Sequence, residues 1–330
     1  MDTPIQSATD HASSEAAGMT PGRPNLEVFA ETLLDLARQD RNVLAVTSDS
    51  RGSGKLTHFG QVLPQQIVEA GIAEQNLVGV AAGLASAGKK VFAVSPACFL
   101  TARALEQIKN DVAYSGHLVK LIGISAGVSY GALGSTHHSL HDLAVLRAIH
   151  NLDIVVPADN FETREAIRAA LDHPRPIYIR FGKKPMPHLH GAGTVFQIGK
   201  AIPVLQGDDV TFIATGETVP HVLSGARLLA KEGLSCRVLS VHTIKPLDLQ
   251  ALLEAGRETG AVITVEEHSV NGGLGEACAS LLMEAGIKVP FRRVGLPDED
   301  TVTGSQSEIF LHYCISGEGL AQTARNLLQP

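Results

Sequence analysis

Short apolar runs rich in β-branched residues alternate, from residue 24 onward, with longer stretches whose apolar residues have helical spacing. This alternation is typical of a parallel sheet covered by helices. The runs are almost continuously apolar, as expected for strands that are buried on both faces. In the first half, the pattern predicts strands at residues 43–46, 90–94, 119–124, 153–157 and 176–181, and helices at 26–37, 74–87, 102–114, 140–149 and 162–171.

The segment GKKPMPHLHGAG, residues 182–193, interrupts the alternation and predicts a domain linker. A second α/β unit follows, with strands expected at 210–215, 236–241, 261–266 and 290–296 and helices at 219–231, 247–256 and 273–285. The 330 residues suit two domains of ordinary size. The predicted fold is therefore α/β with two doubly wound domains, at residues 23–187 and 188–330, after a disordered amino-terminal arm at 1–22.

The composition excludes several classes of function. The net charge of −7 comes with no basic stripe of the kind that nucleic-acid binding requires. The longest apolar stretches are far shorter than the roughly 20 residues of a membrane span, and residues 1–22 lack the apolar core of a secretory signal. The four cysteines are widely spaced, which favours free thiols and a cytoplasmic location: Cys98, Cys236, Cys278 and Cys314.

The segment EAGIAEQNLVGVAAGLASAG, residues 69–88, places Glu74 in the first turn of a helix built from small and apolar residues. Such a helix packs closely against its neighbours, and a buried carboxylate then needs a partner. On this motif alone, Glu74 is equally well explained as a charge that complements the helix dipole.

The loop THHSLHD contains His137, His138 and His141, whose spacing would suit two imidazoles on one helical face. No cysteine or carboxylate cluster completes a zinc site around them, so we predict no metal ligands in this chain.

Three ordered segments resemble the transketolase family of thiamine diphosphate enzymes. GIAEQNLVGVAAGLA resembles the glutamate motif of the family's pyrimidine-binding domain. GSTHHSLHDLAVLRAIHNLDIVVPADNFETREAI, residues 134–167, resembles its histidine loop, and VEEHSVNGGLGEACA, residues 265–279, resembles its carboxy-terminal domain. The resemblance implies a pyrimidine-binding domain followed by a transketolase carboxy-terminal domain.

The resemblance also implies roles for individual residues. Glu74 would hydrogen-bond a ring nitrogen of the thiamine pyrimidine and favour its imino tautomer, and His137 would exchange protons with the ketose. Phe99 would stack on the pyrimidine, and Asp49 would lie near the cofactor. The candidate substrate residues are Ser53, Leu133, His138 and Arg180, with Arg180 matching an arginine that grips the substrate phosphate and Lys183 and Lys184 adding charge nearby.

Four positions depart from the usual transketolase pattern around the expected sugar site. Leu26 stands where a second phosphate-binding arginine is common, Ser125 where a histidine is common, and Ala132 and Leu133 where an acidic pair is normal. Fewer polar groups would meet the sugar, which changes the accepted substrate rather than the cofactor chemistry. We therefore expect an unusual ketose, such as apulose 4-phosphate or a sulfosugar, in place of an ordinary pentulose phosphate.

The family's diphosphate and magnesium motif, Gly-Asp-Gly followed by paired asparagines, is absent from the sequence. We therefore expect a separate amino-terminal transketolase subunit to supply the Mg²⁺ ligands, with active sites at the interface of an α2β2 assembly.

Two enzyme alternatives stay open, the beta chain of a 2-oxo-acid dehydrogenase and a deoxyxylulose phosphate synthase-like enzyme. The histidine loop argues against the beta chain. A non-catalytic assembly subunit is a third alternative, against which the presence of Glu74, Phe99 and His137 speaks.

Overall fold

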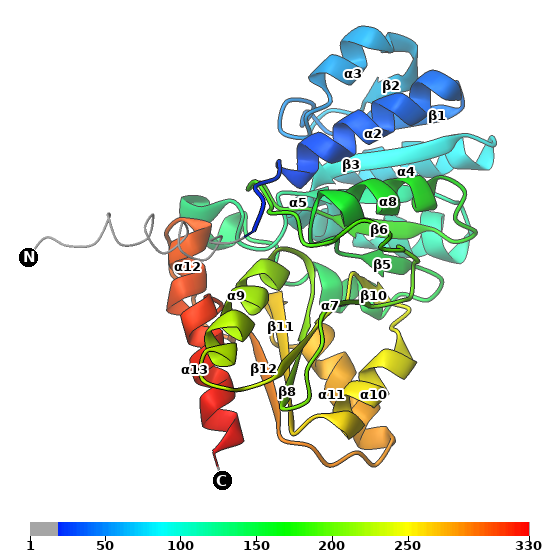
Figure 1. Ribbon diagram of the computed structural model, residues 1–330. Helices are drawn as coiled ribbons and strands as arrows, with labels where there is room; N and C mark the ends of the chain where they lie inside the picture. Colours follow the sequence, from blue (N-terminus) through cyan, green and yellow to red (C-terminus); the bar gives the residue numbers. More distant parts are fainter. Residues whose placement is uncertain (1–18, 330) are drawn as a thin grey trace, which may run out of the picture.

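The computed structural model describes residues 19–329 and arranges them around two sheets with helices on both faces of each (Figure 1). The predicted α/β class with two doubly wound units is confirmed. The predicted arm falls outside the described residues except at its end, where the Thr20 carbonyl accepts a hydrogen bond from the His188 N–H at 2.9 Å. Within residues 19–329, no helix combines the length and apolar character needed to cross a membrane.

The first sheet has seven strands, of which six are parallel. Parallel strands need crossover connections, and here the crossovers are mostly helical. In spatial order the strands are β10 (Thr243–Lys245), β5 (Asp153–Val155), β6 (Ile177–Arg180), β4 (Lys120–Ile124), β3 (Lys90–Pro96), β1 (Val43–Thr47) and β2 (Ile67–Glu69).

Two helices cover one face of this sheet, α2 (Asn25–Gln39) and α8 (Asn160–Leu171). The other face is covered by α4 (Glu74–Ser86), α5 (Ala97–Arg103), α6 (Leu105–Gln107), a π-helix (Ile108–Tyr114) and α7 (Asp142–Arg147). Short α3 (Thr57–Val62) and three 3-10 turns (Pro64–Gln66, Gly131–Thr136, Gly216–Thr218) complete the connections.

The second sheet has the order β12 (Phe291–Leu296), β11 (Ala261–Ser269), β8 (Val210–Ala214), β9 (Cys236–Ser240) and β7 (Ile202–Leu205). Helices α9 (Val219–Ala230), α12 (Gln306–His312) and α13 (Gly317–Leu328) share one core with this sheet. On its other face lie α10 (Leu249–Glu258) and α11 (Leu274–Glu284).

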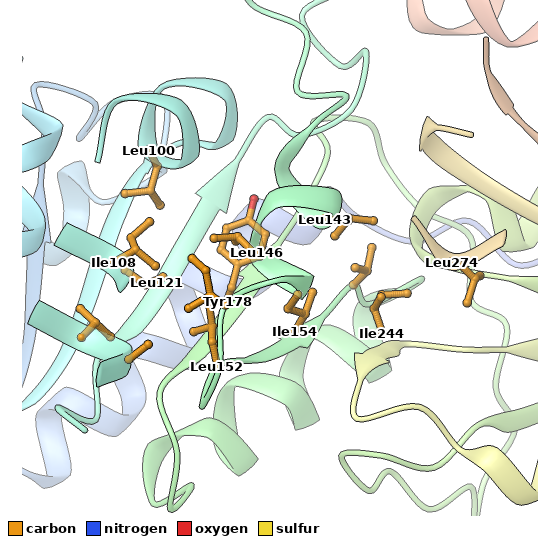
Figure 2. Close-up of a cluster of buried hydrophobic side chains, with 14 of the residues drawn as sticks. Leu100, Ile108, Leu121, Leu143, Leu146, Leu152, Ile154, Tyr178, Ile244 and Leu274 are labelled. Carbon is orange, nitrogen blue, oxygen red and sulfur yellow. The ribbon is translucent and has the colours of Figure 1, made fainter. Parts of the chain in front are cut away.

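One hydrophobic core runs from the first sheet into the second (Figure 2). Leu143 and Leu146 of α7 and Ile154 of β5 lie near Ile244 of β10 and Leu274 of α11 in this cluster. β10 belongs to the second half of the chain but pairs antiparallel with β5, with Thr243 opposite Val155. The division at residue 187 stays a prediction, and the packing joins the two halves into one body.

Two predicted helices were wrong in their bounds. The single helix expected at 102–114 is three segments: α5 begins directly after β3 at Ala97, and its backbone departs from helical geometry at Ala104. The π-helix then continues to Tyr114. This break lets the short α5 contribute Phe99 and Arg103 to the edge of the sheet while Ile108 and Val112 enter the core. The helix expected at 140–149 is shorter, Asp142–Arg147.

Candidate functional site

The carboxyl edge of the first sheet gathers most of the predicted site residues. Glu74 opens α4 just after β2, Phe99 lies in α5 after β3, His137 follows β4 and its 3-10 turn, and Arg180 ends β6. Because these strands are parallel, their carboxyl ends share one edge. Ligands of open α/β sheets bind at this edge.

Glu74 is a buried carboxylate with one cationic partner. Its side chain is 4% exposed, and the Arg103 Nη1 donates hydrogen bonds to both of its oxygens, at 3.0 and 2.9 Å. Arg103 is 47% exposed, so the ion pair reaches from the interior to solvent. A hollow of about 510 Å³ opens over this pair, lined by Ile72, Ala73, Glu74, Gln75, Asn76 and Arg103.

A ladder of ring and cation contacts continues from this ion pair. The Arg103 guanidinium carbon lies 4.1 Å from the centroid of the Phe99 ring. The His137 ring contacts Phe99 on one side and Tyr130 on the other, with centroids 5.3 and 5.2 Å apart in edge-on geometry. The Lys183 Nζ lies 3.7 Å from the centroid of the Tyr130 ring. We call these residues the ladder: Glu74, Arg103, Phe99, His137, Tyr130 and Lys183.

The three histidines of the THHSLHD loop have separate partners. His137 Nδ1 lies 2.9 Å from Thr136 Oγ1, His138 Nε2 lies 2.9 Å from the Gly131 carbonyl, and His141 Nε2 lies 3.2 Å from Thr101 Oγ1. Burial lowers the pKa of His138, which favours its neutral form. Among residues 19–329, no group of three His, Cys, Asp or Glu side chains is arranged to hold a metal ion.

Arg180 is engaged inside the protein. Its Nη1 donates to Asp142 Oδ1 at 2.6 Å, its Nη2 donates to the Glu267 carbonyl at 2.7 Å, and its side chain is 3% exposed. Tyr178 donates its hydroxyl to the other Asp142 oxygen at 2.7 Å. The role of Arg180 as a phosphate ligand stays a prediction, and in this structure its charge is paired with Asp142.

A buried carboxylate pair lies behind Arg180, where the two sheets meet. Gln306 Nε2 donates to Glu217 and to Glu267, at 2.9 and 2.8 Å. Burial, together with the neighbouring Glu217 charge, raises the pKa of Glu267 to about 8. A protonated carboxyl at this position reduces the repulsion between the two acids.

The remaining predicted site residues lie along the same edge without joining the ladder. Asp49, with a φ of 53°, and the exposed Ser53 follow β1, and the Asp49 N–H donates to Glu69 at 2.5 Å. Leu133 is 56% exposed, whereas Ser125 is buried with a φ of 55°. The roles predicted for Asp49, Ser53 and Leu133 stay predictions.

Sequence reasoning missed Tyr130, gave Arg103 no role of its own, and gave Lys183 only that of adding charge near the substrate phosphate. A signal for Arg103 was present, because residues four apart on a helix share a face and Phe99 precedes it by four. Tyr130 and Lys183 meet across two different loops, and no local spacing predicts that contact.

Comparison with known proteins identifies the family of this chain. The family models "Transketolase, pyrimidine binding domain" and "Transketolase, C-terminal domain" match residues 24–187 and 199–320. The chain is 50% identical over 297 residues to one of the subunits of the apulose-4-phosphate transketolase of Phocaeicola vulgatus, covering 90% of this chain and 95% of that protein. It is 38% identical over 272 residues to the 6-deoxy-6-sulfo-D-fructose transketolase subunit SqwH of Clostridium sp. (strain MSTE9), covering 82% of this chain and 84% of that protein.

Among solved structures, one described as "Split gene transketolase, inactive beta4 tetramer" superposes with a TM-score of 0.83 and 33% identity. The alignment covers 93% of this chain and 98% of that one.

Proposed function

Since this chain belongs to the transketolase family, we propose that it is the pyrimidine-binding subunit of a two-chain transketolase that transfers a two-carbon ketol unit from a ketose to an aldose. The observation that carries the proposal is the buried Glu74 carboxylate, which lines an open hollow and is linked to the Phe99 ring through Arg103, the contact partner of both. A carboxylate and a flat aromatic ring are the two groups that a protonated aminopyrimidine needs.

The family depends on thiamine diphosphate, and the residues at this edge fit the pyrimidine end of that cofactor. Glu74 would hold the pyrimidine by a hydrogen bond at a ring nitrogen, and Phe99 would support its face. When bound, the cofactor supplies the carbon nucleophile that attacks a ketose carbonyl. His137, which contacts Phe99, would hold or move a proton at the ketose hydroxyl next to that carbonyl.

The diphosphate end and Mg²⁺ belong, in this proposal, to an amino-terminal transketolase subunit in an α2β2 assembly. Two features support a partner on the Glu74 side of the chain. Ile72, beside Glu74, is 76% exposed, and Tyr114, at the end of the π-helix that contacts α4, is 87% exposed. Large apolar side chains left in solvent beside a cofactor site are typical of an interface that another chain covers.

Reconstitution tests the proposal. The purified chain alone is expected to show no ketol transfer, and addition of an amino-terminal transketolase subunit from the same genome, with thiamine diphosphate and Mg²⁺, should restore it. The assay follows ketose consumption and aldose extension by mass spectrometry. Turnover by the chain alone would refute the two-chain proposal, and turnover of pyruvate instead of a ketose would favour the 2-oxo-acid dehydrogenase or deoxyxylulose phosphate synthase alternatives.

For the substrate, we propose an anionic ketose such as apulose 4-phosphate or 6-deoxy-6-sulfofructose, in line with the names of the relatives. Arg180 is neutralised by Asp142, whereas no carboxylate among residues 19–329 pairs with Lys183. The Lys183 Nζ lies at the end of the ladder, one ring beyond His137. Lys183 is therefore the cation best placed for the phosphate or sulfonate.

Lys183→Met is expected to raise the KM for the anionic ketose about 10- to 100-fold with little change in kcat, because a hydrogen bond to a charged group contributes about 1.5–3 kcal/mol. Lys184→Met is the matched control, since the Lys184 Nζ already bonds Ser307 Oγ at 2.5 Å. Steady-state kinetics of the reconstituted complex measure both. Equal effects of the two changes would contradict a specific role for Lys183.

A further inference from the structure

Arg103 makes two contacts that a bound pyrimidine would also need. Its Nη1 donates to both oxygens of Glu74, and its guanidinium carbon lies 4.1 Å from the centroid of the Phe99 ring. The guanidinium is planar, delocalised and cationic, donates N–H groups to carboxylates and stacks on aromatic rings. A protonated aminopyrimidine shares each of these properties.

The side chains of Glu74 and Arg103 differ in their exposure to solvent. Glu74 is 4% exposed, whereas the Arg103 side chain that pairs with it is 47% exposed and therefore accessible from solvent. Both residues line the same hollow of about 510 Å³. A ring that enters this hollow to bind Glu74 would compete with the guanidinium for the carboxylate.

We propose that the Arg103 guanidinium holds the place of the pyrimidine in the cofactor-free subunit and leaves Phe99 and Glu74 when the cofactor binds. This inference rests on the proposed function, because it needs Glu74 and Phe99 to be the pyrimidine site. Arg103 is then a positioning residue: it neutralises and orients the buried Glu74 carboxylate until the cofactor replaces it.

Displacement of the Arg103 guanidinium weakens cofactor binding and requires a new position for the cation. Because a cofactor that competes with a side chain binds only the open fraction of the sites, its apparent Kd rises as that fraction falls. Glu106 is exposed and follows Arg103 by three residues, so its carboxylate is a partner for the released guanidinium in solvent.

Arg103→Met tests the inference, since methionine keeps an apolar stem against Phe99 and removes the charge and the N–H donors. Thiamine diphosphate with Mg²⁺ is titrated calorimetrically into the reconstituted complex. We expect the Kd for thiamine diphosphate to fall about 2- to 5-fold, because a half-exposed ion pair no longer competes with the cofactor. Lys109→Met removes an exposed cation from the neighbouring π-helix and should leave the Kd unchanged.

An unchanged or raised Kd for Arg103→Met overturns the inference, provided that circular dichroism shows a folded complex. Arg103→Lys, which keeps the charge but lacks the planar fork, provides a second variant and should bind the cofactor more tightly than the wild type but less tightly than Arg103→Met. Glu74→Ala tests the pyrimidine site separately from the role of Arg103. If Glu74→Ala weakens cofactor binding while Arg103→Met does not tighten it, only the role of Arg103 fails; if Glu74→Ala leaves the Kd unchanged, the proposed pyrimidine site itself is wrong.

Discussion

Replacing Glu74 with alanine is expected to lower the turnover of the reconstituted two-chain enzyme about 10²- to 10⁴-fold, the usual contribution of a positioned acid–base group. Of the residues that line the hollow, Glu74 alone is both charged and buried. Its partner Arg103 lines the same hollow. Without it, the proposed pyrimidine site has no group that can share a proton with the ring. Initial rates at saturating cofactor measure the loss.

The loss of activity should not come from unfolding. Glu74 pairs with a half-exposed arginine, and such a pair contributes only about 0–1 kcal/mol after solvent screening. The thermal unfolding midpoint of Glu74→Ala should therefore stay close to that of the wild type. Glu106→Ala removes an exposed carboxylate nearby and serves as the matched control. Full turnover by Glu74→Ala would show that the chain acts only as an assembly subunit.

Replacing Arg180 with leucine should destabilise the folded chain by about 3–5 kcal/mol, because it leaves the Asp142 charge buried without its cationic partner. Asp142 is fully buried, its other oxygen accepts from the Tyr178 hydroxyl, and the His268 Nε2 lies 3.9 Å from Oδ1. Burial lowers the pKa of His268 to about 4, so this ring does not replace the lost cation at neutral pH. The change also removes the hydrogen bond from Arg180 to the Glu267 carbonyl, which joins the two sheets. Urea unfolding followed by far-UV circular dichroism measures the difference.

Two further variants define the origin of this effect. Arg168→Leu breaks an exposed ion pair with Glu165 and should change stability by less than about 1 kcal/mol. The double variant Asp142→Asn, Arg180→Leu removes both charges and should recover part of the lost stability, since the amide oxygen of the introduced asparagine would still accept from Tyr178. If Arg180→Leu instead left stability unchanged and raised only the KM for the sugar, Arg180 would be the phosphate ligand that the family resemblance implies.

The sequence predicted the central strands of both sheets because these strands are buried on both faces and therefore consist of continuous apolar runs. β3, β4 and β8 follow this rule, and their observed bounds lie within two residues of the predicted ones. β2, β7 and β10 were missed. They are three or four residues long and lie at or near sheet edges, so their strand character comes from pairing partners that are distant in sequence.

The site shows the same division between local and long-range information. The motif around Glu74 is local, but on its own it explains this carboxylate equally well as a complement to the helix dipole, and the role predicted for Glu74 came from the resemblance to the transketolase family. The pairing of Glu74 with Arg103 joins the first residue of α4 to the last residue of α5, 29 positions apart. Arg180 was expected to face a substrate phosphate, but its engagement with Asp142 depends on packing between α7 and β6, which no motif encodes.

β10 makes completion of the first sheet depend on the order in which the chain is synthesised. Strands β1 to β6 leave the ribosome first, and β5 then has an unpaired edge until residues 243–245 emerge and pair with it. An open strand edge is a template for pairing with other chains. The nascent first half is therefore exposed to aggregation for as long as the second half is being translated, and a fragment that ended at residue 187 would keep that open edge permanently.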